Sequence, residues 1–160
     1  MQVITTRLEA EEAKIIYQET AGLAIITINR PQAKNALTAN MWDELARIAL
    51  LTLENPKNKV LLIRGAGENF TAGSDIKEFN SISLKDAEEA FIHMENTIST
   101  IENLPIPVIG VINGPAMGAG LELALACDIR IGSDNARLGI PVGKLGITLN
   151  NKFAKRLVDL

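Results

Sequence analysis

The chain has 160 residues, a formal charge of −3, 47% hydrophobic residues and a single cysteine. One domain of this length can bury about 70% of the surface that its unfolded chain exposes. The charge argues against nucleic acid as a partner, one cysteine excludes an internal disulfide, and no apolar run reaches the length of a membrane span. We therefore expect a cytoplasmic globular protein, in which local basic groups and backbone N–H groups would have to meet any anionic ligand.

The chain reads as one series of alternating strands and helices. Residues 1–6 lack the basic and then apolar order of a secretory signal, and we expect a short lead-in over residues 1–14. Turn residues and N-caps mark the element boundaries, notably Ala21-Gly22, Thr38 and Ser83. The predicted elements are, in order, a hairpin of residues 15–19 and 23–28, a helix from 38 to about 54, a strand at 60–64, a helix at 84–102, a strand at 108–112, a helix at 119–126, a strand at 129–132 and the opening of an amphipathic helix at 151–160.

This order predicts the fold class. The strands after the hairpin are mainly apolar and not amphipathic, which is typical of parallel strands in βαβ crossovers. Such strands need helices to cover them. We therefore predict an α/β fold with parallel strands covered by helices, in one core that spans residues 15–160.

Two glycine-containing segments, residues 70–78 and 113–123, each lead through a bend into a helix. The first N–H groups of a helix have no intrahelical partner and favour negative charge. Two such donors directed at one oxygen form an oxyanion hole, which is usually the largest single contribution in acyl-group chemistry. Glu122 lies in the first turn of the second helix, within reach of whatever binds there. The pattern indicates a site that could form and protonate an enolate.

These segments belong to a longer pattern of motifs, and with it the chain resembles the crotonase superfamily, the enoyl-CoA hydratase/isomerase family of acyl-CoA enzymes. The resemblance covers about residues 15–146 and implies that the strands and helices form a right-handed ββα spiral. The motifs that carry it are, in chain order, Asn29-Arg30-Pro31, Asn35-Ala36-Leu37, Phe70 to Lys77, Asn113-Gly114 through Glu122-Leu123, Ala126-Cys127-Asp128-Ile129-Arg130 and Gly139-Ile140-Pro141.

The resemblance implies three catalytic residues. The N–H groups of Ser74 and Ala119 would hold a thioester oxygen, and Glu122 would be the acid or base. Many relatives have glycine at the place of Ala119, but only the backbone acts there, so alanine serves if its φ is negative. Simpler readings stay open: a turn with Asp75 as a helix cap, and a glutamate that complements the helix dipole.

The sequence departs from the hydratase pattern at Val142, because hydratases have a second catalytic glutamate directly after the proline of this motif. Loss of an acid–base group typically costs about 10²–10⁴ in rate, so efficient hydration is in question. A CoA-thioester decarboxylase or hydrolase on the same fold is therefore an alternative. Another is a non-catalytic acyl-CoA binding or truncated member, since most of the family's C-terminal helical region is absent from these 160 residues.

The resemblance also implies an acyl-CoA thioester as substrate, with no cofactor beyond its coenzyme A moiety. Arg30, Lys34 and Lys77 are the basic groups nearest to the expected diphosphate, and His93 is expected at the surface. One cysteine and one histidine exclude the usual zinc spacings, so no metal is expected. If the chain is complete, the family implies a homotrimer or hexamer. The substrate-binding residues expected are Gln32, Ala33, Lys34, Ala72, Gly73, Asp75, Ile76, Lys77 and Gly118.

Overall fold

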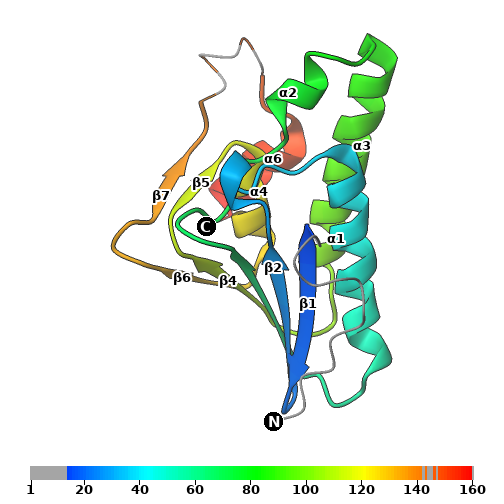
Figure 1. Ribbon diagram of the computed structural model, residues 1–160, viewed down its shortest axis with the longest axis vertical. Coiled ribbons are helices and arrows are strands. Elements are labelled where there is room, and N and C mark those ends of the chain that lie inside the picture. Colours follow the sequence, from blue (N-terminus) through cyan, green and yellow to red (C-terminus); the bar gives the residue numbers. More distant parts are fainter. Residues whose placement is uncertain (1–13, 142, 144–145, 147, 160) are drawn as a thin grey trace.

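The computed structural model describes residues 14–141, 143, 146 and 148–159. Val142 and residues 1–13 of the predicted lead-in lie outside these residues. The main feature is a five-stranded sheet in the order β1-β2-β3-β4-β6, in which only the β1–β2 pair is antiparallel (Figure 1). The strands are β1 (Ile15–Thr20), β2 (Leu23–Ile28), β3 (Val60–Gly65), β4 (Val108–Ile112) and β6 (Ile129–Gly132).

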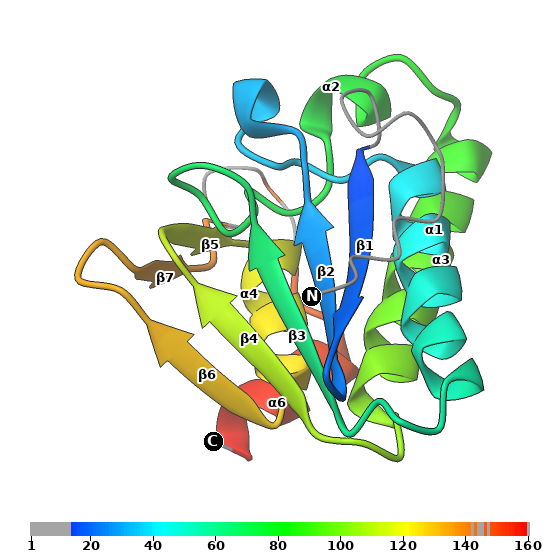
Figure 2. The same cartoon turned by 60° about the horizontal axis from the view of Figure 1, so that its bottom comes forward.

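Helices cover one face of this sheet. Figure 2 shows α1, α3, α4 and α6 on the same side of the strands, and α3 packs against both α1 and α4. Side chains cap three of these helices at their N-termini: Thr38 for α1, Ser83 for α3 and Asn150 for α6. The helices are α1 (Ala39–Leu51), α2 (Ile76–Phe79), α3 (Leu84–Glu102), α4 (Ala119–Ala126) and α6 (Asn151–Val158), with 3-10 turns η1 (Pro31–Ala33) and η2 (Thr52–Glu54).

The core lies between the sheet and these helices. Alternate residues of β2 and β3, such as Ile26 and Ile63, point into it and are fully buried. Trp42 of α1 and Ile98 of α3 meet them from the helical side. The predicted α/β fold with parallel strands covered by helices is therefore confirmed.

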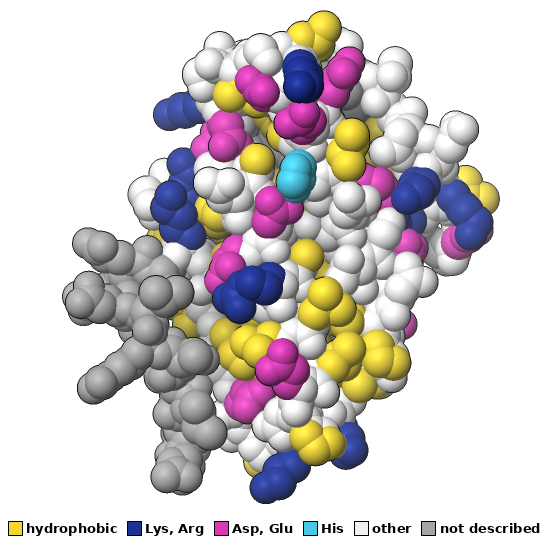
Figure 3. Space-filling view, turned by 90° about the vertical axis from the view of Figure 1, so that its right-hand side faces the viewer, with side chains coloured by type: hydrophobic (Ala, Val, Ile, Leu, Met, Phe, Trp, Pro, Cys, Tyr) yellow, Lys and Arg dark blue, Asp and Glu magenta, His cyan; other side chains and the backbone are white. Residues whose placement is uncertain are grey.

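The outer surface of α1 and α3 is mixed in character. Figure 3 shows charged and apolar side chains interspersed on this side of the molecule, with the imidazole of His93 at the surface. His93 Nδ1 lies 2.6 Å from Asp43 Oδ1, and both side chains are about half exposed. The surface position predicted for this histidine is confirmed.

A second, two-stranded sheet was missed by the sequence analysis. β5 (Pro115–Met117) pairs in parallel with β7 (Arg137–Gly139). Each strand has only three residues, too few to show a hydrophobic period. Their pairing depends on the tertiary fold, and it places β5 directly before α4 and beside the first glycine-containing segment.

Candidate active site

The two glycine-containing segments lie side by side. Thr71 forms an isolated parallel bridge with Ala116, and the N–H of Met117 donates to the carbonyl of Thr71 at 3.1 Å. Beyond this bridge, Gly73 has a φ of +88°, and a Cβ built on it would lie 3.0 Å from the N atom of Ala119. Glycine at position 73 is therefore what lets the backbone of one segment approach the start of the other.

Ser74 forms an isolated parallel bridge with Leu37, but the N–H of Ser74 does not take part in its hydrogen bonds. The N–H of Leu37 donates to Gly73, and the N–H of Asp75 donates to Leu37, at 2.8 and 2.9 Å. Ser74 lies between these two bonds, and its N–H makes no hydrogen bond within the part of the chain that the structure describes. An N–H donor is thus available in the segment whose Gly73 approaches the start of α4.

Ala119 supplies a comparable donor. It is the first residue of α4, where an N–H has no intrahelical partner, and among the described residues nothing accepts from it. Its φ is not in the positive range, so alanine fits this position without strain. Gly118 before it takes φ +55° and donates its N–H to Gly139 at 2.9 Å, which fixes the bend. Both predicted donors are therefore unpaired and adjacent.

The side chain of Ser74 faces the core rather than the α4 segment. The indole Nε1–H of Trp42 donates to Ser74 Oγ at 3.2 Å, and Oγ lies 3.4 Å from Sδ of Met94. These contacts tie the hydroxyl to α1 and α3. Any role of this residue at the site thus falls to its backbone.

Glu122 is far more enclosed than a group that simply complements a helix dipole. Its side chain is 2% exposed, and Oε1 accepts a hydrogen bond from Nη1 of Arg156 at 2.6 Å. Burial and the nearby charge of Glu95 raise the pKa of Glu122 from 4.5 to about 7, although Arg156 acts in the opposite direction. A carboxyl with this pKa can both accept and donate a proton near neutral pH.

Arg156 of α6 is a residue that the sequence analysis missed. Besides Glu122, it donates from Nη2 to Glu95 and to Glu102 of α3, both at 2.9 Å. The position of Arg156 on the buried side of an amphipathic helix was the only signal available, and arginine there is uncommon unless it is paired. Although burial acts to raise it, the hydrogen bonds from Arg156 and Ser99 hold the pKa of Glu95 below its ordinary value.

Asp75, a predicted substrate-binding residue, and Arg30, predicted to lie near the diphosphate, form an ion pair with each other. Arg30 Nη1 lies 2.5 Å from Asp75 Oδ2 and also donates to the carbonyl of Ala36. Asp75 Oδ1 accepts from the N–H of Lys77 and so caps α2. Burial acts to raise the pKa of Asp75, but the bond from Arg30 holds it below its usual range. Arg30 would have to leave Asp75 to reach a diphosphate.

The remaining predicted binding residues lie around the two donors at the surface. Lys34, in the left-handed region with φ 53°, and Lys77 are both exposed. The N–H of Ala72 donates to the carbonyl of Lys34 at 3.0 Å, so the two predicted coenzyme stretches are in direct contact. Gln32 is exposed, Ala33 is partly buried, and Ile76 presents a side chain that is 52% exposed.

Asn35 holds these stretches together, a role that the sequence motif did not reveal. It is fully buried in the left-handed conformation with φ 57°. Its Oδ1 accepts from the N–H of Arg30, and its Nδ2 donates to the carbonyls of Ala66 and Asn69 at 2.9 and 2.7 Å. This side chain links the segments that follow β2 and β3.

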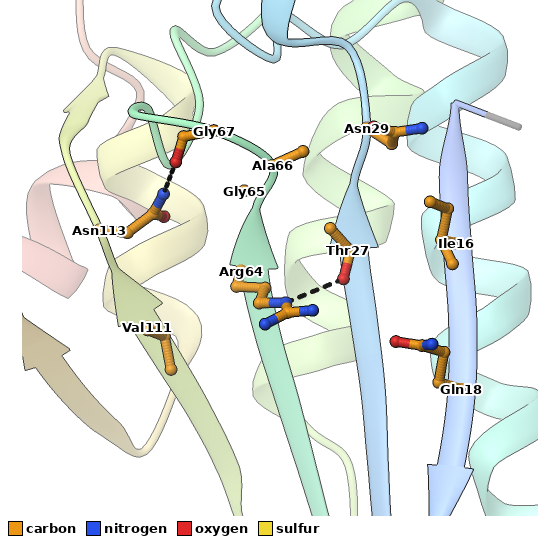
Figure 4. A pocket seen from close by; sticks show the side chains of 10 residues that line it. All are labelled: Ile16, Gln18, Thr27, Asn29, Arg64, Gly65, Ala66, Gly67, Val111 and Asn113. Carbon is orange, nitrogen blue, oxygen red and sulfur yellow. Dashed lines mark hydrogen bonds between the residues drawn. The ribbon is translucent and has the colours of Figure 1, made fainter. Parts of the chain in front are cut away.

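A separate pocket of about 550 Å³ opens near the carboxyl ends of β2, β3 and β4 (Figure 4). The Nε–H of Arg64 donates to Thr27 Oγ1 at 3.1 Å, and Asn113 Nδ2 donates to the carbonyl of Gly67 at 2.6 Å. None of the predicted site residues lines this pocket. Its lining residues are Ile16, Gln18, Thr27, Asn29, Arg64, Gly65, Ala66, Gly67, Val111 and Asn113.

Comparison with protein families gives one decisive match. Residues 18–159 match the model of the enoyl-CoA hydratase/isomerase family. The chain belongs to this family. The Bacillus subtilis relative YngF is 43% identical over 139 residues, which are 86% of this chain and 54% of that protein. The crotonyl-CoA hydratase of Syntrophomonas wolfei is 38% identical, with 91% and 56% covered.

Solved structures of the family agree with the fold. The enoyl-CoA hydratase of Bacillus anthracis superimposes with a TM-score of 0.88 at 35% identity, over 92% of this chain and 58% of that one. The chain thus has the crotonase-type fold and spans about half the length of the curated relatives that it matches. Within the described residues, no helix is long and apolar enough to cross a membrane.

Proposed function

We propose that the protein is an acyl-CoA enzyme of the enoyl-CoA hydratase/isomerase type that stabilises a thioester enolate. The N–H groups of Ser74 and Ala119 receive the thioester oxygen, and Glu122 moves a proton on the acyl chain. The observation that carries the proposal is the close approach at Gly73, which brings two unpaired donors together at the start of α4.

The chemistry follows from where charge develops. When a proton leaves the carbon next to the thioester carbonyl, or a group adds to the neighbouring carbon, negative charge moves onto the carbonyl oxygen. Preorganised N–H donors stabilise this charge, and loss of one such donor typically costs about 10²–10³ in rate. The positive end of α4 adds to the effect at Ala119. The raised pKa of Glu122 suits it to take up and return the proton.

The substrate part of the proposal rests on the family. Coenzyme A would lie along Gln32 to Lys34 and Ala72 to Lys77, with the two exposed lysines nearest to its phosphates, and no further cofactor is required. The relatives that are named as hydratases support enoyl-CoA chemistry over the decarboxylase, hydrolase and non-catalytic alternatives. The homotrimer or hexamer and the cytoplasmic location stay predictions.

The direct test is deuterium exchange at carbon 2 of a saturated acyl-CoA in D₂O, followed by NMR. It detects enolate formation and does not depend on which product the enzyme releases. Glu122→Gln should lower the exchange rate by about 100-fold or more with little change in ligand affinity. Glu88→Gln, the same change at an exposed position on α3, is the control. Unchanged exchange in Glu122→Gln would remove Glu122 from the mechanism.

A further inference from the structure

Arg156 connects the proposed catalytic glutamate to two helices. Its side chain is 5% exposed, and its guanidinium contacts one carboxylate of α4, Glu122, and two of α3, Glu95 and Glu102, at 2.6 to 2.9 Å. Each Nη atom and Nε takes part, since Nε also lies 3.2 Å from both oxygens of Glu102. The arginine therefore has a fixed orientation set by α3 and α4 together.

The charges around Glu122 do not balance. Three carboxylates surround a single guanidinium, and the other cation of the cluster, Lys152, lies 3.4 Å from Glu95 with a side chain that is 62% exposed. Among the described residues, the elements that pack most extensively against α4 are α3, α6 and β5, and β5 contributes no charged residue. A buried cluster with excess negative charge favours the retention of a proton.

The contacts indicate which carboxylate retains it. Glu95 is stabilised as an anion by Arg156, Lys152 and the hydroxyl of Ser99. Glu122 is the most buried of the three carboxylates. Its Oε1 accepts a hydrogen bond from Arg156, whereas its hydrogen bond with Glu95 favours the protonated form. The two environments push the proton affinities of these carboxyls apart, which is the pattern that separates acid and base roles.

We propose that Arg156 is a positioning residue for Glu122, and that Arg156 and Glu95 act in opposite directions to set the protonation state of Glu122. The role of this arrangement in catalysis rests on the proposed function, whereas the effect of Arg156 and Glu95 on the protonation of Glu122 does not. It accounts for how one carboxylate in the site could serve as both base and acid in successive steps. It also gives α6 a specific part in the site, since α6 supplies the only cation that touches Glu122 within the described residues.

The inference predicts opposite shifts from two substitutions. Glu95→Gln removes a negative charge beside Glu122 and leaves Arg156 less neutralised, so the titration midpoint of Glu122 should fall by about one pH unit or more. Arg156→Gln removes the cation that contacts Glu122, so the midpoint of Glu122 should rise by a similar amount. Arg156→Lys retains the positive charge but not the bidentate geometry. The midpoint of Glu122 in this variant should therefore lie close to the wild-type value.

The experiment is a ¹³C NMR titration of the glutamate side-chain carboxyls of the intact protein, with the Glu122 signal assigned by its loss in Glu122→Gln. Glu88→Gln is the matched control, because this exposed glutamate of α3 has no contact with the cluster. A midpoint that stays in place in Glu95→Gln, or that moves upward, would overturn the inference. This variant keeps the bonds from Arg156 to Glu102 and Glu122, so the test stands even if Arg156→Gln does not fold.

Measurement of the pH profile of deuterium exchange on the same variants separates the two proposals. If the midpoint of exchange follows the NMR midpoint, both are supported. If the NMR midpoints shift as expected but no variant and no wild-type protein exchanges deuterium, the proposed function fails and the electrostatic inference holds. If wild-type protein exchanges deuterium and the midpoints do not shift, the inference alone fails.

Discussion

The two halves of the candidate site are built in different ways. The donor half consists of backbone N–H groups at Ser74 and Ala119, whose directions are fixed by glycine bends and short bridges. The acid–base half consists of long side chains from α3, α4 and α6 that meet in a buried ion cluster. Backbone donors tolerate many side chains at their positions, whereas the cluster depends on the identity of every member. Substitutions should therefore act by different routes in the two halves.

The largest effect is expected from Ala119→Pro. Proline removes the N–H donor, and position 119 is the first residue of α4, where proline is well tolerated by a helix. We expect exchange at carbon 2 to fall by about 10²–10³-fold while the far-UV circular dichroism is unchanged. Ala119→Gly, which keeps the N–H, is the control. Retained exchange in a folded Ala119→Pro protein would mean that the second donor is misassigned.

Gly73→Ala should affect both stability and activity. Position 73 has φ +88°, and a Cβ there would lie 2.7 Å from the carbonyl oxygen of Met117 and 3.0 Å from the N of Ala119. Strain of this kind typically costs about 1–3 kcal/mol, and its relief would separate the two donors. Chemical denaturation and exchange assays should both show a loss. Gly132→Ala, where the new Cβ would meet only the Cβ of Ala136 at 3.4 Å, is the control.

Glu122→Gln should change how stability depends on pH. The pKa of Glu122 is raised to about 7 in the folded protein, so its contribution is fully present below its ordinary pKa of 4.5 and is lost as the pH rises through 7. The free energy of unfolding of the wild type, relative to Glu122→Gln, should fall by up to about 3 kcal/mol between about pH 4 and pH 8. A difference that is constant with pH would contradict the raised pKa.

The smallest effect is expected from Ser74→Ala, which keeps the backbone donor. The hydroxyl accepts from the indole of Trp42, so its loss leaves a buried N–H without that partner at a cost of about 1–2 kcal/mol. Exchange should remain close to the wild-type rate. Ser81→Ala, which removes an exposed hydroxyl bonded to Glu78, is the control. A large loss of exchange would show that the side chain of Ser74 takes part in the reaction.

The position of each backbone donor could be predicted from the sequence because its determinants are local. The bend at Gly118 and the start of α4 are contained in one short segment, as are Gly73 and the start of α2. The resemblance to the family then indicated which N–H group of each segment would donate. The same holds for the strands of the main sheet and for the caps Thr38 and Ser83, where neighbouring residues decide the conformation. Features that depend on residues close together in the sequence, such as helix caps and bends, can therefore be predicted from it.

The acid–base half could not be predicted in the same way. Arg156 lies 34 residues after Glu122 and 61 after Glu95, and no periodicity relates the three positions. Arg30 and Asp75 are 45 residues apart, so the sequence could not show that their side chains form an ion pair with each other. The β5–β7 pair was missed for the same reason. Contacts between distant segments are decided by the packing of whole elements.

The separation of Arg156 from its partners also bears on how the protein is made. A ribosome completes α3 and α4 before it reaches α6, so Glu95 and Glu122 emerge before the residue that joins them. In that interval the two carboxylates would repel each other as the sheet forms, unless one of them takes up a proton. Once α6 has emerged, Arg156 can pair with both carboxylates and so complete the acid–base half of the site.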